Sequence, residues 1–211
     1  MIKSKKFWVT LLVVLVGQAA LYWFVKLFQS NFHYIDFFLD DKIPLIPWSI
    51  WIYNSFYPVL LISYYSIFQK NEKNFMNAMI CCVLCTIISD IFFICYPTII
   101  DHGVVPDTDF LTKLNLDITY FFDNPATNCF PSIHCSYSFQ AMFALFLTKD
   151  LNKKFRWPMF IYLFFVAIST VFTKQHYFYD ILGGLVVFII ANLINYKFHL
   201  YDKLKKIKFF A

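Results

Sequence analysis

Residues 75–96 read FMNAMICCVLCTIISDIFFICY, and Asp90 is the one charged side chain in this stretch. A helix needs roughly 20 mostly apolar residues to cross the hydrocarbon core of a bilayer, so this stretch is long enough to span it. Apolar runs of similar character recur along the chain. They predict six transmembrane helices, at about 7–28, 49–69, 75–96, 133–148, 157–173 and 177–196.

The overall composition agrees with a membrane setting. Of the 211 residues, 60% are hydrophobic, 22% are aromatic and 15% are charged. A water-soluble domain of this length would have difficulty burying so much apolar surface, whereas a bilayer accommodates it. We therefore predict an all-α, polytopic membrane protein in which residues 1–211 form a single membrane-embedded domain.

Basic residues are distributed unevenly between the two ends of the predicted helices. Fourteen of the eighteen precede the first helix, follow the second or fourth, or lie in the tail: Lys3, Lys5, Lys6, Lys70, Lys73, Lys149, Lys153, Lys154, Arg156, Lys197, Lys203, Lys205, Lys206 and Lys208. Because positively charged loops stay in the cytoplasm, we predict that both termini are cytoplasmic. The basic residues alternate with membrane spans instead of forming one stripe, which argues against a nucleic-acid partner.

The segment CFPSIHCS, residues 129–136, places polar side chains between apolar runs at the predicted outer face. Ser132 follows a proline and opens the predicted fourth helix, so its hydroxyl is a candidate N-cap and phosphate contact. The unpaired amides of a first helical turn also favour an anion. His134 lies in the same turn and is a candidate general acid that protonates a departing alkoxide.

His176 and Asp180 lie at the outer start of the predicted sixth helix. Their spacing of four residues puts them on one helical face, where the carboxylate can accept the Nδ1 proton of the imidazole. Nε2 is then available for attack, which makes His176 a candidate nucleophile and Asp180 its orienting acid. Each feature alone has a structural explanation as well: a helix cap, an interfacial histidine or a helix-stabilising pair. Their convergence at one membrane depth favours a catalytic site.

The segment FPSIH, followed by STVFTKQHYFYDILGG at residues 169–184, resembles the second and third signature motifs of the type 2 phosphatidic acid phosphatase superfamily. The matching positions are Pro131, Ser132 and His134 in the first segment and Ser169, His176 and Asp180 in the second. The resemblance implies a bundle of six spans and a metal-independent, cofactor-free reaction through a phosphohistidine. It assigns the attack to His176 and the proton transfers to His134.

The sequence departs from the superfamily pattern at its phosphate-binding arginines. Thr170 stands at the arginine of the last motif, and the first motif, with its lysine and arginine, is missing. Arg156 is the one arginine of the chain, and we predict that it is cytoplasmic. Lys174 is the best substitute by position, and Lys113 and His102 are weaker candidates for phosphate binding in the preceding outer loop.

Together these features predict a lipid phosphatase that hydrolyses a phosphate or pyrophosphate ester of a lipid at the extracytoplasmic face. With a hydroxyl acceptor in place of water, the same residues would catalyse phosphotransfer. The segment KQHYFYD resembles the inositol phosphorylceramide and sphingomyelin synthase-like branch more closely than the arginine-rich phosphatases. The missing arginines leave open a non-catalytic scaffold or a transporter. A haem held by His134 and His176 is the least favoured alternative.

The expected partners are a lipid phosphate or phospholipid substrate and the bilayer itself. The lysine-rich, arginine-poor composition indicates an AT-rich genome, so we expect a bacterial plasma membrane. The four glycines provide no phosphate-cradling loop. The six cysteines form no metal signature, although Cys129 and Cys135 flank the CFPSIHCS segment and could pair in an oxidising compartment. The substrate and the oligomeric state stay open.

Overall fold

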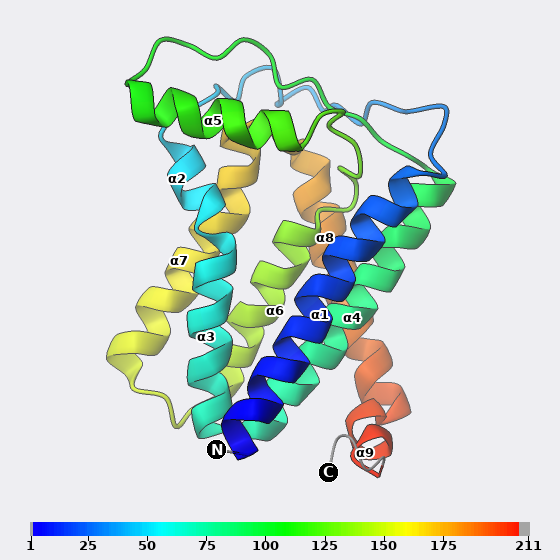
Figure 1. Ribbon diagram of the computed structural model, residues 1–211, viewed down its shortest axis with the longest axis vertical. Helices are drawn as coiled ribbons and strands as arrows, with labels where there is room; N and C mark the ends of the chain where they lie inside the picture. The colour runs from blue at the N-terminus through cyan, green and yellow to red at the C-terminus, as the bar shows by residue number, and fades with distance from the viewer. Residues whose placement is uncertain (1, 207–211) are drawn as a thin grey trace.

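The computed structural model describes residues 2–206 of the chain, with side chains from residue 5 onward. Within that range the protein is all-α, as predicted. Its helices are α1 Ile2–Lys26, α2 Ser49–Asn54, α3 Phe56–Lys70, α4 Glu72–Cys95, α5 Phe110–Phe122, α6 Ile133–Leu147, α7 Lys153–Phe172, α8 Phe178–Phe198 and α9 Leu200–Leu204. The long helices pack side by side, and α5 lies across one end of them, which we call the α5 end (Figure 1).

Four helical segments are long and apolar enough to cross a membrane: Lys5–Lys26, Glu72–Cys95, Lys153–Phe172 and Phe178–Phe198. They identify an integral membrane protein. Helix α6 is also apolar, but it is shorter than these four. Four of the six predicted spans thus correspond to helices that are long enough to cross a membrane. The other two, which correspond to α6 and to α2 with α3, stay predictions.

The predicted span at 49–69 is divided in two at Ser55, between α2 and α3. Pro58 explains the break. It has no backbone N–H to donate to the carbonyl of Asn54, and its ring crowds that carbonyl. The Ser55 hydroxyl donates instead to the carbonyl of Ile52 at 2.6 Å, which satisfies one of the exposed acceptors at the end of α2.

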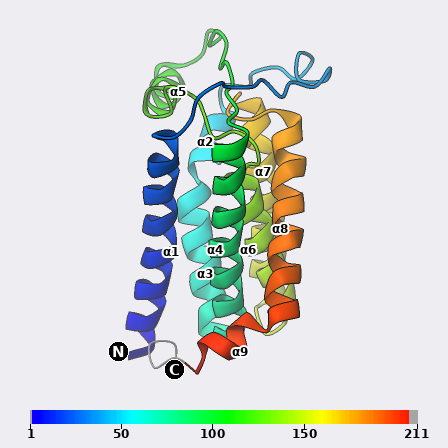
Figure 2. The ribbon, with the colours of Figure 1, turned by 90° about the vertical axis from the view of Figure 1, so that its right-hand side faces the viewer.

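Helix α6 occupies the centre of the bundle, where it contacts α3, α4, α7 and α8. Figure 2 shows it between these neighbours. Small and polar side chains let the helices approach closely, and the buried ones on α6 include Ser136, Ser138, Gln140, Ala141 and Ala144. The first turn of α6, which carries His134, therefore starts among the ends of the surrounding helices.

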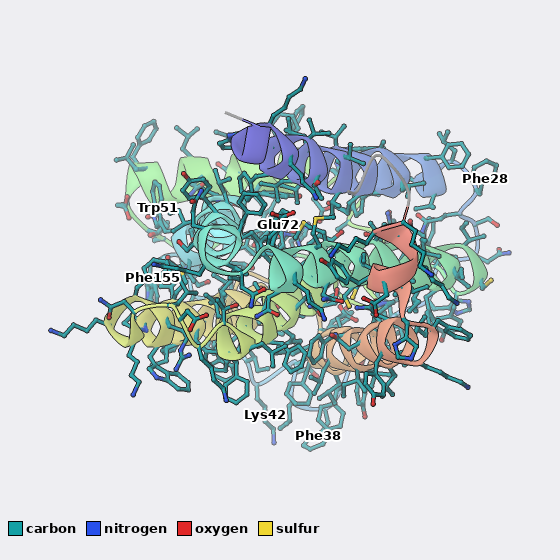
Figure 3. All side chains as sticks on the ribbon, turned by 90° about the horizontal axis from the view of Figure 1, so that it is seen from below. Phe28, Phe38, Lys42, Trp51, Glu72 and Phe155 are labelled. Atoms are coloured by element: carbon teal, nitrogen blue, oxygen red, sulfur yellow. The ribbon has the colours of Figure 1, made fainter. Side chains whose placement is uncertain are left out.

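The outer surface of the bundle is apolar. On α1 the side chains of Leu12, Val13 and Val16 are each more than half exposed, at 54%, 63% and 61%. Figure 3, a view along the bundle from the end opposite α5, shows side chains projecting outward around the whole circumference. A continuous apolar surface of this kind requires an apolar solvent, because soluble monomers rarely expose one.

The two ends of the bundle differ in the charge of the segments that connect the helices. The N-terminus, the α3–α4 and α6–α7 connections and α9 all lie at the end opposite α5 (Figure 1). These segments carry most of the basic residues counted from the sequence; Lys208 lies outside the described residues. Which end faces the cytoplasm is still a prediction, based on this clustering of positive charge.

Helix α5 was not predicted from the sequence, because residues 97–132 read as a long loop. Asp109 caps it by accepting a hydrogen bond from the backbone N–H of Thr112 at 3.0 Å. Most of its exposed side chains are large and apolar, and these are Phe110, Leu111, Leu114, Ile118, Phe121 and Phe122; Lys113 and Asp117 are exposed as well. The helical spacing of these residues after a capping aspartate was a usable signal.

Candidate active site

The start of α6 is fastened to the start of α8. The backbone N–H of Ser132 donates to the carbonyl of Asp180 at 3.1 Å. Ser132 also caps α6, because its hydroxyl oxygen accepts a hydrogen bond from the N–H of Cys135 at 3.3 Å. These bonds join the two segments that the sequence identified as a motif pair, although they are far apart along the chain.

Two adjacent glycines in α8 allow this approach. A Cβ atom on Gly184 would lie 2.7 Å from the carbonyl oxygen of Ser132 and 2.8 Å from the Cβ of Cys135. A Cβ on Gly183 would lie 2.6 Å from the ring of Phe130. Such distances are well inside van der Waals contact. A side chain at position 183 would displace the Phe130 ring, and one at position 184, which meets backbone, would force α8 away from the CFPSIHCS segment.

His176 and Asp180 form the predicted pair. Nδ1 of His176 lies 3.1 Å from Oδ2 of Asp180, and the same oxygen accepts a hydrogen bond from the N–H of Tyr177 at 2.9 Å. The backbone N–H of His176 donates to the carbonyl of Thr170 at 3.1 Å, which fixes the residue at the end of α7. With the carboxylate on Nδ1, the assigned tautomer leaves Nε2 of His176 for the substrate.

His134 faces His176. Their ring centroids are 6.1 Å apart and the rings are tilted by 60°. On its other side the His134 ring packs against two aromatic side chains of the α2–α3 region, Tyr53 at 4.8 Å and Phe56 at 4.5 Å. The two histidines thus lie close enough for one phosphoryl group to contact both.

Both histidines line a cavity of 410 Å³ near the α5 end. Its walls come from α1, α2, α3 and α5, from the segment between α5 and α6, from the first turn of α6 and from the turn between α7 and α8. Several polar side chains that line it were not identified from the sequence: Gln18, Asn54, Asn115, Thr119, Asp123 and Gln175. No motif marks these positions, and they are brought together by tertiary packing alone.

Asp123, just after α5, is the carboxylate on the cavity wall. The Tyr22 hydroxyl donates to its Oδ1 at 2.9 Å, and Nε2 of His102 lies 3.8 Å from its Oδ2. Burial raises the pKa of Asp123, while the Lys26 ammonium nearby acts in the opposite direction. Asp123 is also within electrostatic range of His176.

The side chain of Lys174 binds another loop and does not line the cavity. Its ammonium donates to the carbonyl oxygens of Asp40 at 2.9 Å and Ile43 at 2.7 Å. The Asp40 side chain in turn accepts a hydrogen bond from the N–H of Phe178 at 2.9 Å. In this arrangement Lys174 fixes the loop that contains Asp40 over the start of α8.

The other predicted phosphate contacts also lie outside the cavity wall. His102 stacks on Tyr120, with centroids 4.0 Å apart, and its Nδ1 lies 2.9 Å from the carbonyl oxygen of Lys174. Lys113 is exposed on α5, and Ser132 is fully buried at the cap of α6. None of these three side chains, nor that of Lys174, is among the cavity-lining residues.

The described residues give no sign of a metal site or a disulfide. No group of three or more His, Cys, Asp or Glu side chains between residues 5 and 206 is arranged to hold a metal ion. Cys129 and Cys135 are free and buried, and their thiols contact the carbonyls of Ala126 and Ala167 respectively. The sequence had left their pairing open.

The fold and the site define a class: an integral membrane bundle in which two neighbouring helix starts present a carboxylate-paired histidine and a second histidine to one cavity. The profile of the PAP2 superfamily matches residues 26–194, and the chain belongs to that superfamily. No curated protein and no solved structure matches the chain. Superfamily membership indicates phosphate-ester substrates and, in general, lipid phosphatase or phosphotransferase activity.

Proposed function

We propose that the protein transfers a phosphoryl group from a lipid phosphate ester through a phosphohistidine on His176. The observation that carries this proposal is the pairing of His176 with Asp180 at 3.1 Å, opposite His134 across one cavity. A nucleophile, an acid that orients it and a proton donor are the parts that such a displacement requires.

In the first step, Nε2 of His176 attacks phosphorus. The bond from phosphorus to the lipid oxygen breaks, and His134 gives its proton to the departing alkoxide. The carboxylate of Asp180 stabilises the positive charge that develops on the His176 ring. Histidine-bound phosphate and the free lipid alcohol are the products of this half-reaction.

In the second step, His134 removes a proton from the acceptor, whose oxygen attacks the phosphohistidine and releases His176. Water as the acceptor makes the protein a phosphatase. A hydroxyl compound as the acceptor makes it a phosphotransferase.

We further propose that six spans cross the membrane, that both termini are cytoplasmic and that the cavity opens at the extracytoplasmic face. The basic residues at the end opposite α5 support this orientation. A bacterial plasma membrane remains our expectation for the location. Cysteine-accessibility labelling of single-cysteine variants at residue 107, near the α5 end, and at residue 150, near the other end, tests the orientation in intact cells.

The activity is tested with purified protein in detergent and a panel of lipid phosphates and phospholipids in the presence of a chelator. We expect lipid alcohol to be released by the wild type, an acid-labile phosphoprotein to be trapped, and both to be lost in His176→Ala. The matched control is His33→Ala, because that ring stacks on Tyr96 outside the cavity. Undiminished release by His176→Ala would rule out the proposal, and lipid binding without turnover would favour a scaffold or transporter.

A further inference from the structure

The cavity wall is poor in positive charge. Among the residues that the structure describes, neither a lysine nor an arginine lines the cavity, and the wall contains the carboxylate of Asp123. The remaining polar lining is largely neutral: Gln18, Asn54, Asn115, Thr119, Asn128 and Gln175. Burying a charge without a partner is unfavourable, so the charge of the ligand at phosphorus matters here.

The lysines near the cavity already have other partners. Lys26 donates to the carbonyl of Pro125 at 3.1 Å, and its ammonium lies 4.9 Å from the ring centroids of Tyr22 and Trp23. The ammonium of Lys174 is held by two loop carbonyls, as described above. The His176 imidazole is paired with Asp180, so the pair adds little net positive charge even when the ring is protonated.

Asp123 is held in place on the cavity wall, and its carboxylate lies near any ligand there, although Nε2 of His102 lies 3.8 Å from its Oδ2 and the Lys26 ammonium offsets part of its charge. The Tyr22 hydroxyl fixes one of its oxygens at 2.9 Å, and 21% of its side chain is exposed. A phosphate monoester carries up to two negative charges at neutral pH, and a phosphodiester carries one. A second charge several ångströms from Asp123, at the effective dielectric of a partly buried site, weakens binding by about tenfold or more.

We propose that the cavity selects phosphodiesters over phosphate monoesters, and that Asp123 sets this preference. The inference rests on the proposed function, which it makes more specific: the donor is a phospholipid whose phosphorus carries both the lipid and a second alcohol. The neutral amides and hydroxyls on the wall hydrogen-bond that second alcohol and the phosphoryl oxygens without requiring a full charge.

The reaction with such a donor balances in the same way as the mechanism above. Nε2 of His176 forms a bond to phosphorus, the bond to the diacylglycerol oxygen breaks, and His134 protonates that oxygen. The histidine then carries the phosphoryl group with its second alcohol still attached. Water or a hydroxyl acceptor takes this group and returns a proton to His134.

The test measures binding separately from turnover. Three lipids with identical acyl chains are compared: phosphatidic acid, which is a monoester, and two diesters, phosphatidylmethanol and phosphatidylglycerol. Phosphatidylmethanol isolates the effect of charge, because its second alcohol is minimal. Equilibrium binding is measured on purified His176→Ala protein in detergent, and diacylglycerol release is measured on protein with His176 intact.

We expect both diesters to bind at least about tenfold more tightly than phosphatidic acid at neutral pH. Asp123→Asn is expected to reduce this ratio about tenfold. Asp117→Asn, which removes the same charge from an exposed position on α5 outside the cavity, is expected to leave the ratio unchanged. Asn115→Lys adds a cation to the wall and is expected to shift the ratio toward phosphatidic acid, with Asn115→Gln as its control.

The inference and the proposed function fail in different ways. Equal or tighter binding of phosphatidic acid to the parent protein would overturn the inference, and so would a ratio that neither Asp123→Asn nor Asn115→Lys changes. Absence of diacylglycerol from every lipid, together with a preserved preference for diesters in binding, would overturn the proposed catalysis and leave the inference about the cavity intact. If Asp123→Asn does not fold, the comparison of Asn115→Lys with Asn115→Gln decides.

Discussion

The cavity has two sides of different origin. The motif side consists of the CFPSIHCS segment, the α7–α8 turn and the first turn of α8, and it presents both histidines. The opposite side, which we call the assembled side, is built from α1, α2 and α5 and presents Tyr22, Asn115 and Asp123. The motif side contains the two segments that resemble the signature motifs of the superfamily, whereas the charge of the assembled side follows no motif. In the function and the inference proposed above, the motif side performs the chemistry and the assembled side selects the ligand.

The motif side also has the denser network of backbone restraints. Ser132 is bonded to the carbonyl of Asp180, and the N–H of His176 is bonded to the carbonyl of Thr170. The assembled side is linked mainly through side chains, such as the bond from Tyr22 to Asp123 and the one from Asn54 to Asn115 at 2.8 Å. Substitutions on the motif side should therefore affect rate, and substitutions on the assembled side should affect which ligand is used.

Asp180→Asn is the substitution expected to have the largest effect among those that keep the nucleophile. The amide can donate to Nδ1 and so stabilise the wrong tautomer, and it no longer stabilises the charge on the ring. We expect the turnover number to fall on the order of 10³-fold with little change in KM. Steady-state kinetics in detergent, with circular dichroism as the folding control, measure this. A comparable rise in KM would instead assign Asp180 to substrate binding, and it would contradict the division between the motif side and the assembled side.

Gly184→Ala tests the close approach of α8 to the CFPSIHCS segment. The added methyl group would meet the Ser132 carbonyl at 2.7 Å, and relieving that clash is expected to destabilise the protein by about 1–3 kcal/mol. We expect a lower melting temperature in detergent and an activity reduced about tenfold or more, because Ser132 and Asp180 would separate.

The control for that substitution is Gly17→Ala on α1. A Cβ at Gly17 meets nothing within 4 Å, so the same chemical change is expected to leave both stability and activity close to the wild type. If the two alanine variants behave alike, the glycines of α8 do not hold the motif side together.

The sequence was most informative where chemistry depends on short spacing. The helix class, the apolar runs and the pair of His176 with Asp180 follow from periodicity and from a separation of four residues. The division of α2 from α3 was missed because hydropathy averages over Pro58. Helix α5 was missed because it is short and because its apolar residues lie in a stretch that is rich in aspartates.

The assembled side could not be predicted from the sequence, because its contacts are long-range. Tyr22 and Asp123 are 101 positions apart, and Tyr53 and Gln175 are 122 positions apart. Neither pair has a local pattern. Lys174 illustrates the converse difficulty: its position two residues before His176 predicted a phosphate contact, but the loop carbonyls that hold its ammonium come from residues 40 and 43.

Lys174→Gln distinguishes a role in positioning from a role in phosphate binding. Loss of its two bonds to the carbonyls of Asp40 and Ile43 is expected to lower stability by about 1–3 kcal/mol and to reduce the turnover number a few-fold, with KM nearly unchanged. Lys42→Gln is the control, because that ammonium lies over the Phe38 ring in the same loop. A rise in KM of tenfold or more in Lys174→Gln would instead make this residue a direct phosphate contact and assign it to ligand binding.

The smallest effect is expected from the exposed apolar side of α5. Phe110 and Phe121 are 76% and 75% exposed, and an amphipathic helix that lies across the end of a membrane bundle is suited to the lipid interface. We expect the double substitution Phe110→Ser with Phe121→Ser to reduce turnover of a long-chain lipid in vesicles about twofold, and to leave turnover of a short-chain analogue in detergent unchanged. Asp117→Ser, on an exposed polar position of the same helix, is the control.

A matching loss with the short-chain analogue would mean that the apolar side of α5 stabilises the assembled side directly, since α5 supplies Asn115 and Thr119 to the cavity. A loss confined to vesicles would show that the helix which forms part of the ligand-selecting wall also places that wall at the depth where phospholipid head groups lie.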